Sequence, residues 1–120
     1  MTWTRLDDGF SDHPKVMKVT PLAELLQVRA LQYANRYLTD GHIGRAALPS
    51  LARGMAAYRE RGRLVTAEAL AEQLVAAGIW DRAMDGYQVH DFLVYQNSRE
   101  KVLGERAAAR ERMAKLRGSA

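Results

Sequence analysis

Residues 74–100, LVAAGIWDRAMDGYQVHDFLVYQNSRE, constrain the fold of this chain more than any other stretch. An apolar helix end runs into Gly78, and a short strand is expected at 79–80. Asp85-Gly86 is a strong turn signal, and it separates that strand from a second one at 87–90. A strongly charged helix follows. A helix followed by a two-stranded ribbon predicts an α+β domain, and the ribbon argues against the alternative of an all-α bundle.

The residues before this stretch predict two further helices and a brief strand. Apolar residues recur at helical spacing over 22–38, after a threonine N-cap and a first-turn proline at 20–21. A brief strand is expected at 42–43, and a shorter helix from Arg45 to about Arg53. Residues 54–65 fit either a continuation of that helix or a basic loop.

Thr66 is expected to cap a third helix that Gly78 ends. Asn97 or Ser98 is expected to cap a last helix that reaches about Arg117. The fold class is therefore mainly α with a small β-wing: a winged helix-turn-helix domain over 1–96 and a basic helical extension over 97–120. We expect the following apolar side chains in the core: Trp3, Phe10, Leu25, Leu31, Leu70, Leu74, Trp80 and Phe92.

The excess positive charge lies in the last 24 residues. The chain has a net charge of +4. Residues 1–96 contain 11 Lys/Arg and 11 Asp/Glu, whereas residues 97–120 contain seven and three. A cationic arm on a neutral body suits a polyanionic partner, either nucleic acid or an anionic membrane surface. The alternative is a solvated helix whose charges only keep the protein in solution.

Composition favours a cytoplasmic protein without membrane insertion. There are no cysteines, which excludes disulfides and thiolate metal sites and fits a reducing compartment. The N-terminus carries acidic residues and no apolar run, so it does not resemble a secretory signal. No apolar stretch approaches the roughly 20 residues that span a bilayer, and the tail lacks the aromatic residues that anchor interfacial helices.

No residue pattern indicates an enzyme. The three histidines are far apart and none lies in an HxxxH or HExxH pattern. Phosphate-binding and dinucleotide-binding glycine motifs are missing. His90 and Asp91 are adjacent at a strand end, so their side chains are expected on opposite faces and not as a catalytic pair. We expect no catalytic residue, no cofactor and no metal.

The residues of the third helix fit either contacts with DNA bases or contacts with protein. Its outward face is expected to carry Thr66, Glu68, Glu72 and Gln73, of which Gln73 suits adenine. Two carboxylates oppose tight groove reading, so a helix that packs or binds a protein stays open as an alternative. We expect backbone-dominated, salt-sensitive binding of duplex DNA. The candidate DNA-binding residues are Arg53, Arg59, Arg61, Arg63, Thr66, Gln73, Arg82, Arg99, Lys101, Arg106, Arg110, Arg112, Lys115 and Arg117.

Three stretches carry a family resemblance: TWTRLDDGFSDHPKV at 2–16, TDGHI at 39–43, and residues 74–100. Together they resemble the N-terminal winged helix-turn-helix domain of phage and prophage replisome-organiser, or DnaD-like, replication proteins, including the actinobacteriophage type. The resemblance runs from Trp3 to about Arg106. It implies a module that binds origin DNA and helps to recruit the helicase loader.

Two other roles fit the same fold. One is a phage transcription regulator, and the other is a small protein-interaction module that binds and modulates a host replication or transcription factor. A homodimer would suit a palindromic site, although nothing in the sequence requires one.

Overall fold

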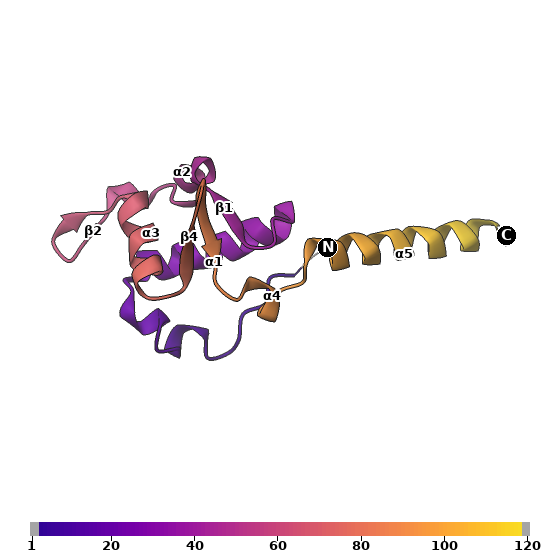
Figure 1. Cartoon of the computed structure of the whole chain (residues 1–120), viewed down its shortest axis with the longest axis horizontal. Coiled ribbons are helices and arrows are strands. Elements are labelled where there is room, and N and C mark those ends of the chain that lie inside the picture. The colour runs from indigo at the N-terminus through magenta and orange to yellow at the C-terminus, as the bar shows by residue number, and fades with distance from the viewer. Residues whose placement is uncertain (1–2, 119–120) are drawn as a thin grey trace.

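Helix α1 (Pro21–Tyr37) is the element on which the body of the protein packs (Figure 1). In this computed structural model, residues 3–118 are described. The other helices are α2 (Leu48–Leu51), α3 (Ala67–Ala76), α4 (Phe92–Tyr95) and α5 (Arg99–Gly118). The strands are β1 (His42–Gly44), β2 (Arg59–Glu60), β3 (Arg63–Leu64), β4 (Trp80–Ala83) and β5 (Gly86–Val89). Single 3₁₀ turns lie at Phe10–Asp12, Val16–Lys18, Arg45–Ala47 and Met55–Ala57. The protein is thus a mixed α/β structure with small antiparallel sheets, in agreement with the expected α+β class.

The N-terminus of α1 is held by side chains from distant segments. Thr20 occupies the cap position as predicted, but its hydroxyl makes no capping hydrogen bond. Instead, Gln73 Oε1 accepts a hydrogen bond from the Thr20 backbone N–H over 3.0 Å, and Glu60 Oε2 accepts one from the Leu22 N–H over 3.0 Å. These acceptors satisfy N–H groups that the first helical turn leaves open. The contacts tie α1 to α3 and to the segment that precedes α3.

The main sheet has the strand order β1-β5-β4, with both pairs antiparallel. Ala83 pairs with Gly86, so the connecting loop is Met84-Asp85. The expected turn at Asp85-Gly86 is therefore displaced by one residue. Gly86 belongs to β5, where an added Cβ would lie 2.2 Å from the Ile43 carbonyl oxygen. Only glycine allows β1 to approach β5 this closely, and β1 itself confirms the brief strand expected at 42–43.

Residues 54–65 are neither a helix nor a basic loop, so both predictions for them are wrong. They form a 3₁₀ turn followed by the hairpin β2–β3, in which Arg59 pairs with Leu64 and Glu60 with Arg63. The base of the hairpin is closed by a hydrogen bond from the Val65 N–H to the Tyr58 carbonyl over 3.1 Å. Val65 is buried, so the hairpin is attached to the core at its root. The shorter second helix, predicted from Arg45 to about Arg53, is confirmed as a helical segment that ends at Leu51 and consists of a 3₁₀ turn followed by α2.

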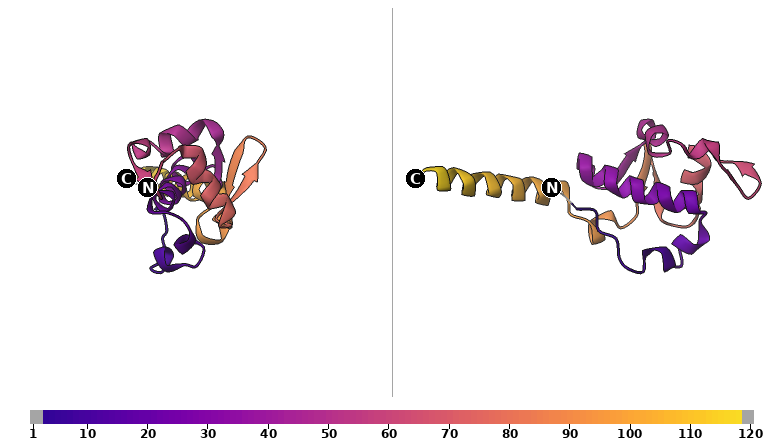
Figure 2. Two further views of the ribbon diagram at one scale, coloured as in Figure 1. Left: turned by 90° about the vertical axis from the view of Figure 1, so that its left-hand side faces the viewer. Right: turned by 180° about the vertical axis from the view of Figure 1, so that it is seen from behind.

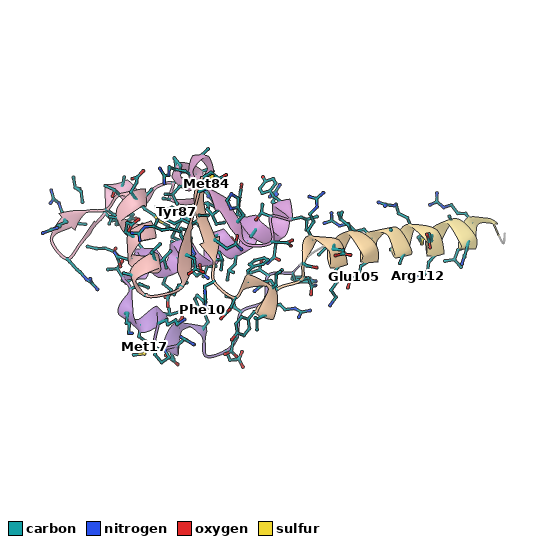
Figure 3. All side chains as sticks on the ribbon, viewed as in Figure 1. Phe10, Met17, Met84, Tyr87, Glu105 and Arg112 are labelled. Carbon is teal, nitrogen blue, oxygen red and sulfur yellow. The ribbon has the colours of Figure 1, made fainter. Side chains whose placement is uncertain are left out.

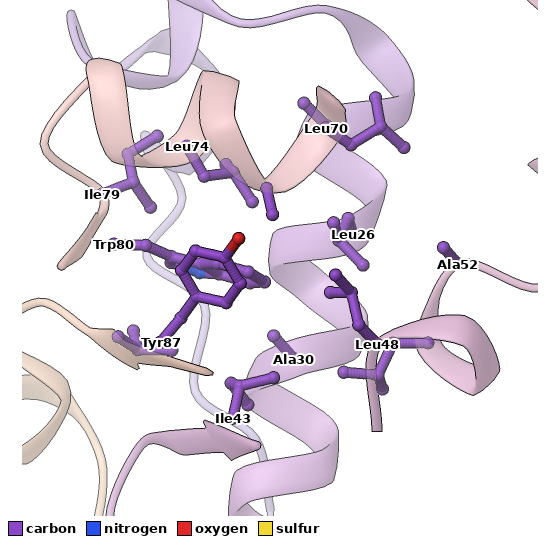
Figure 4. Packing of buried hydrophobic residues seen from close by; sticks show 14 of the residues in the cluster. Leu26, Ala30, Ile43, Leu48, Ala52, Leu70, Leu74, Ile79, Trp80 and Tyr87 are labelled. Atoms are coloured by element: carbon purple, nitrogen blue, oxygen red, sulfur yellow. The ribbon is translucent and has the colours of Figure 1, made fainter. Parts of the chain in front are cut away.

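The core lies between α1, α2, α3 and the main sheet (Figure 4). Its largest fully buried side chains are Trp80, Leu26, Ile43, Leu48, Leu70 and Leu74. Among the expected core residues, the structure confirms Leu31, Leu70, Leu74, Trp80 and Phe92, and Phe10 is half-buried against the same cluster.

Two core predictions are wrong. Leu25 is 38% exposed, because Leu26 faces the core and consecutive helical residues diverge by about 100°. Trp3 is 77% exposed, since the N-terminal segment makes its apolar contacts farther along, at Phe10 and Val16.

Helix α5 extends away from the body and gives the molecule extents of 66 × 29 × 26 Å (Figures 1 and 2). Ser98 caps it by accepting a hydrogen bond from the Lys101 N–H over 3.1 Å, which decides between the two predicted cap residues. Val102 is the one buried residue among those described in this helix. At the base of α5, the buried amide of Asn35 donates to Gln96 Oε1 over 3.0 Å. None of the described helices has the length and apolarity needed to cross a bilayer.

Candidate nucleic-acid interface

The β2–β3 hairpin gathers three exposed arginines: Arg59, Arg61 and Arg63. Within residues 3–118, none of the three forms an ion pair. Glu60 is the cross-strand partner of Arg63, but its carboxylate accepts a hydrogen bond from the Leu22 N–H at the N-terminus of α1 and forms no ion pair with the arginines. The hairpin therefore presents cationic side chains whose charge is not neutralised by the protein.

The tip of this hairpin is a two-residue turn. Arg61 has φ 53° and Gly62 has φ 79°, and two positive φ values in a two-residue loop identify a type I′ turn. Glycine adopts this region readily, whereas an L-residue such as arginine pays roughly 1–2 kcal/mol for it. Glu60, which directly precedes the turn, accepts from the Leu22 N–H through Oε2, and its other oxygen, Oε1, is buried without a hydrogen-bond partner among the described residues. The turn places Arg61 at the apex of the hairpin, with its side chain exposed.

Helix α3 begins directly after the hairpin, but its polar side chains are largely engaged within the protein. Thr66 caps the helix as predicted, because its Oγ1 accepts from the Ala69 N–H over 3.1 Å. Gln73 is half-buried and its Oε1 accepts from the Thr20 N–H. The expectation that Gln73 lies on the outward face is therefore wrong, since its side chain turns back to α1. Exposed Glu68 and Glu72 make the outward face acidic, as the sequence predicted.

Arg82, on β4, contacts α3 through Glu72. Its guanidinium forms an ion pair with Glu72, and the Tyr87 hydroxyl donates to the other oxygen of that carboxylate over 3.4 Å. Burial raises the pKa of Tyr87, and the negative charge of Glu72 raises it further. Arg82 is thereby neutralised within the protein. Arg53, also a predicted contact, donates to the Ser50 carbonyl over 3.0 Å and lies outside the hairpin.

The cations of α5 divide into two stripes. Successive helical residues are rotated by about 100° around the helix axis. Four arginines separated by 7, 4 and 7 residues therefore lie within about 40° of one another around α5, with no carboxylate between them: Arg99, Arg106, Arg110 and Arg117. A second group, Lys101, Arg112 and Lys115, lies on another side of the helix, near Glu105 and Glu111. Figure 3 shows Glu105 and Arg112 on the extended part of α5. The sequence prediction included all seven cations but not the stripe, which their spacing alone reveals.

The structure brings the predicted DNA-binding residues together as two groups at opposite ends of the molecule. The hairpin lies at one end of the long axis and α5 at the other, both in the view of Figure 1 and from behind in Figure 2. Thr66 adjoins the hairpin group. Arg53, Gln73 and Arg82 belong to neither group: Arg53 donates to the Ser50 carbonyl three residues earlier, Gln73 accepts from Thr20, and Arg82 pairs with Glu72.

His90 contacts Asp91, so the prediction that their side chains point apart is wrong. Asp91 has φ 56°, in the left-handed region, which ends the strand alternation and turns its carboxylate to 3.4 Å from His90 Nε2. Asp81 lies 2.8 Å from His90 Nδ1. His90 and Asp91 border a 420 Å³ pocket under the N-terminal segment, which apolar side chains such as Leu31 and Val89 also line. Among the described residues, no group of three or more His, Asp or Glu is arranged to hold a metal ion.

No protein-family model matches this chain, and neither does any curated protein or solved structure.

Proposed function

We propose that this protein is a winged-helix protein that binds duplex DNA, mainly through backbone phosphates. The observation that carries the proposal is the hairpin at the start of α3, with three exposed arginines and no carboxylate to neutralise them. Uncompensated arginine on a protruding ribbon is suited to phosphate oxygens, because its guanidinium offers several donors in a fixed plane. The arginine stripe of α5 adds a second cationic surface.

The order of the elements supports the winged-helix assignment. Helix α1, strand β1, helices α2 and α3 and the hairpin β4–β5 follow one another along the chain, and β1 pairs with β5. This is the order of a winged helix domain, with β4–β5 as the wing. The β2–β3 hairpin is inserted between α2 and α3, where a helix-turn-helix has a short turn. The insertion supplies the positive charge that the exposed face of α3 lacks.

The shape of the molecule sets the expected length of the contact. The two cationic groups lie at opposite ends of a 66 Å axis. A duplex that runs along this axis spans about 19 base pairs at 3.4 Å each. A duplex contacted by the hairpin alone is covered over fewer than about 10 base pairs. Protection of the DNA backbone from hydroxyl radicals separates the two modes.

A salt-titrated mobility shift with a duplex of mixed sequence tests DNA binding. If roughly five phosphates are neutralised, log K against log salt falls with a slope near −4 to −5. Arg59→Ala and Arg63→Ala together lower affinity, whereas Arg36→Ala, which removes an exposed charge from the last turn of α1, leaves it nearly unchanged. No binding at low salt contradicts the proposal.

A second candidate function is a protein-interaction module that binds a replication or transcription factor. Leu93, Val94 and Tyr95 on α4 are 56%, 71% and 65% exposed, and three consecutive exposed apolar residues are typical of a protein contact. The acidic face of α3 offers weaker support than the sequence alone indicated, because Arg82 pairs with one of its two carboxylates. The resemblance to phage replisome-organiser domains favours a role in replication initiation or transcription regulation. We propose that the protein acts in the cytoplasm and without a cofactor.

A further inference from the structure

Arg61 occupies a backbone conformation that disfavours arginine, at the apex of the β2–β3 hairpin. Its φ of 53° suits glycine or asparagine, which type I′ turns prefer. Within residues 3–118, its guanidinium makes no hydrogen bond or ion pair, so no contact inside the protein offsets the strain. Strain retained at an exposed tip, without an internal compensation, points to a function for the side chain.

The two flanking arginines point to opposite faces of the ribbon. Arg59 is opposite Leu64 and Arg63 is opposite Glu60, and these two cross-strand pairs are adjacent. Adjacent pairs in a β-ribbon project to opposite sides. The hairpin therefore carries one arginine on each face and a third at the tip. The Arg63 face also carries Glu60, whose carboxylate reaches the N-terminus of α1, so this face lies towards the body while Arg63 itself stays exposed. The three exposed arginines thus surround the tip, which suits insertion of Arg61 between two rows of phosphates.

We propose that Arg61 enters the minor groove of duplex DNA, with Arg59 and Arg63 directed to the phosphates on either side. This inference rests on the proposed DNA binding and names the groove that the hairpin reads. A narrow minor groove, as in A·T-rich DNA, has an enhanced negative potential that attracts an inserted arginine. The amino group of guanine N2 projects into the same groove and obstructs it.

The hairpin is poorly suited to the major groove. That groove is about 12 Å wide and accepts a whole ribbon lying flat against base edges. Strands β2 and β3 contain two residues each, too few to lie along it. One face of the ribbon would also place Glu60 towards the bases, and this carboxylate is already engaged with the Leu22 N–H. Insertion of the tip alone agrees with the width of the major groove, the short strands and the engaged carboxylate of Glu60.

Modified duplexes distinguish the two grooves. Replacement of guanine by inosine removes the minor-groove N2 amino group and leaves the major groove unchanged, whereas 7-deazaguanine removes the N7 acceptor from the major groove alone. We expect the full chain to bind an A·T duplex and an inosine-containing duplex at least about five-fold more tightly than the same G·C duplex. 7-Deazaguanine is expected to change nothing.

Variants at the tip connect the preference to Arg61. Arg61→Asn is expected to remove the preference for the inosine duplex and to raise the melting temperature, since asparagine tolerates positive φ. Arg61→Ala is also expected to remove it. Arg36→Ala removes one positive charge from the distant last turn of α1 and is expected to keep it.

The possible outcomes distinguish minor-groove insertion of Arg61 from DNA binding in general. Weaker binding to the 7-deazaguanine duplex, with no gain from inosine, assigns the hairpin to the major groove and overturns the inference. A loss of affinity in the Arg61 variants that is equal for all duplexes makes Arg61 a phosphate contact; DNA binding then stands and minor-groove reading falls. If the unaltered chain binds no duplex, both proposals fail.

Discussion

The indole Nε1 of Trp80 donates a hydrogen bond to Gln27 Oε1 over 2.6 Å, and both side chains are buried. This contact joins the main sheet to α1 through the centre of the core. It is the only hydrogen bond among the described residues that the Trp80 side chain makes. A buried donor that loses its acceptor bears the full cost of desolvation.

Gln27→Leu is therefore expected to lower the free energy of unfolding by about 1–3 kcal/mol. Urea denaturation followed by tryptophan fluorescence measures the change. Gln32→Leu is the matched control, because Gln32 is exposed on the same helix and a change there is expected to have little effect. Equal stability of the Gln27 variant and the original chain would show that the indole N–H finds another partner.

Glu72→Gln is expected to increase DNA affinity and to steepen the salt dependence. The substitution removes a negative charge and releases Arg82 from its ion pair, which frees one more cation for phosphates. Each additional phosphate contact changes the slope of log K against log salt by about −0.9. Glu68→Gln removes the same charge from the exposed face of α3 without releasing an arginine. If both variants alter the slope equally, Arg82 takes no part.

The arginine stripe of α5 is expected to contribute more to DNA binding than the opposite stripe. Arg106→Ala with Arg110→Ala is expected to make the salt slope shallower by about 1.8, at 0.9 per phosphate contact. Lys101→Ala with Arg112→Ala removes the same total charge from the other side of the helix. A mobility shift at several salt concentrations compares the two double variants. Indistinguishable slopes would mean that only the net charge of α5 matters.

Two glycines in open space are expected to respond oppositely to alanine. An added Cβ meets nothing within 4 Å at Gly104 or at Gly54, but Gly54 has φ +80°. Gly104→Ala is expected to favour helical α5 by about 1 kcal/mol, seen as a later loss of ellipticity at the helical minimum on heating. Gly54→Ala is expected to lower the free energy of unfolding by roughly 1–2 kcal/mol, because alanine is strained at positive φ. A stabilising Gly54→Ala would contradict the assigned backbone conformation.

Tyr87 gives the fold a dependence on alkaline pH. Its pKa is raised above the ordinary value of 10.0 by burial and by the charge of Glu72. A folded-state pKa above the unfolded one means that the neutral phenol stabilises the fold below pH 10, and that this contribution is lost as the pH rises through the folded-state pKa. Tyr87→Phe is expected to lose less stability than the original chain over that range. Denaturant unfolding at a series of pH values measures the difference; identical pH profiles would sink the idea.

Much of the fold was predictable because its signals are local. Pro21 begins α1, Thr66 caps α3, and a glycine with positive φ follows α3 at Gly78. These features depend on residues within one or two turns of each other, so the sequence alone indicates them. The arginine stripe of α5 is also a property of spacing within one helix. The ribbon after α3 follows from its alternating residues and its turn, although the turn lies one residue earlier than expected.

Contacts between distant segments were decided only by the tertiary structure. The β2–β3 hairpin has a weak turn signal in Arg61-Gly62, and it forms where Val65 is buried and Glu60 reaches α1. Packing between distant segments also turns Gln73 towards Thr20 and Arg82 towards Glu72. Which side chain meets which depends on how the helices and strands pack, and local spacing carries no information about that. The sequence by itself determined the helices that became α1, α2, α3 and α5, the ribbon after α3 and the cationic tail. The packing determined which arginines remain free to bind.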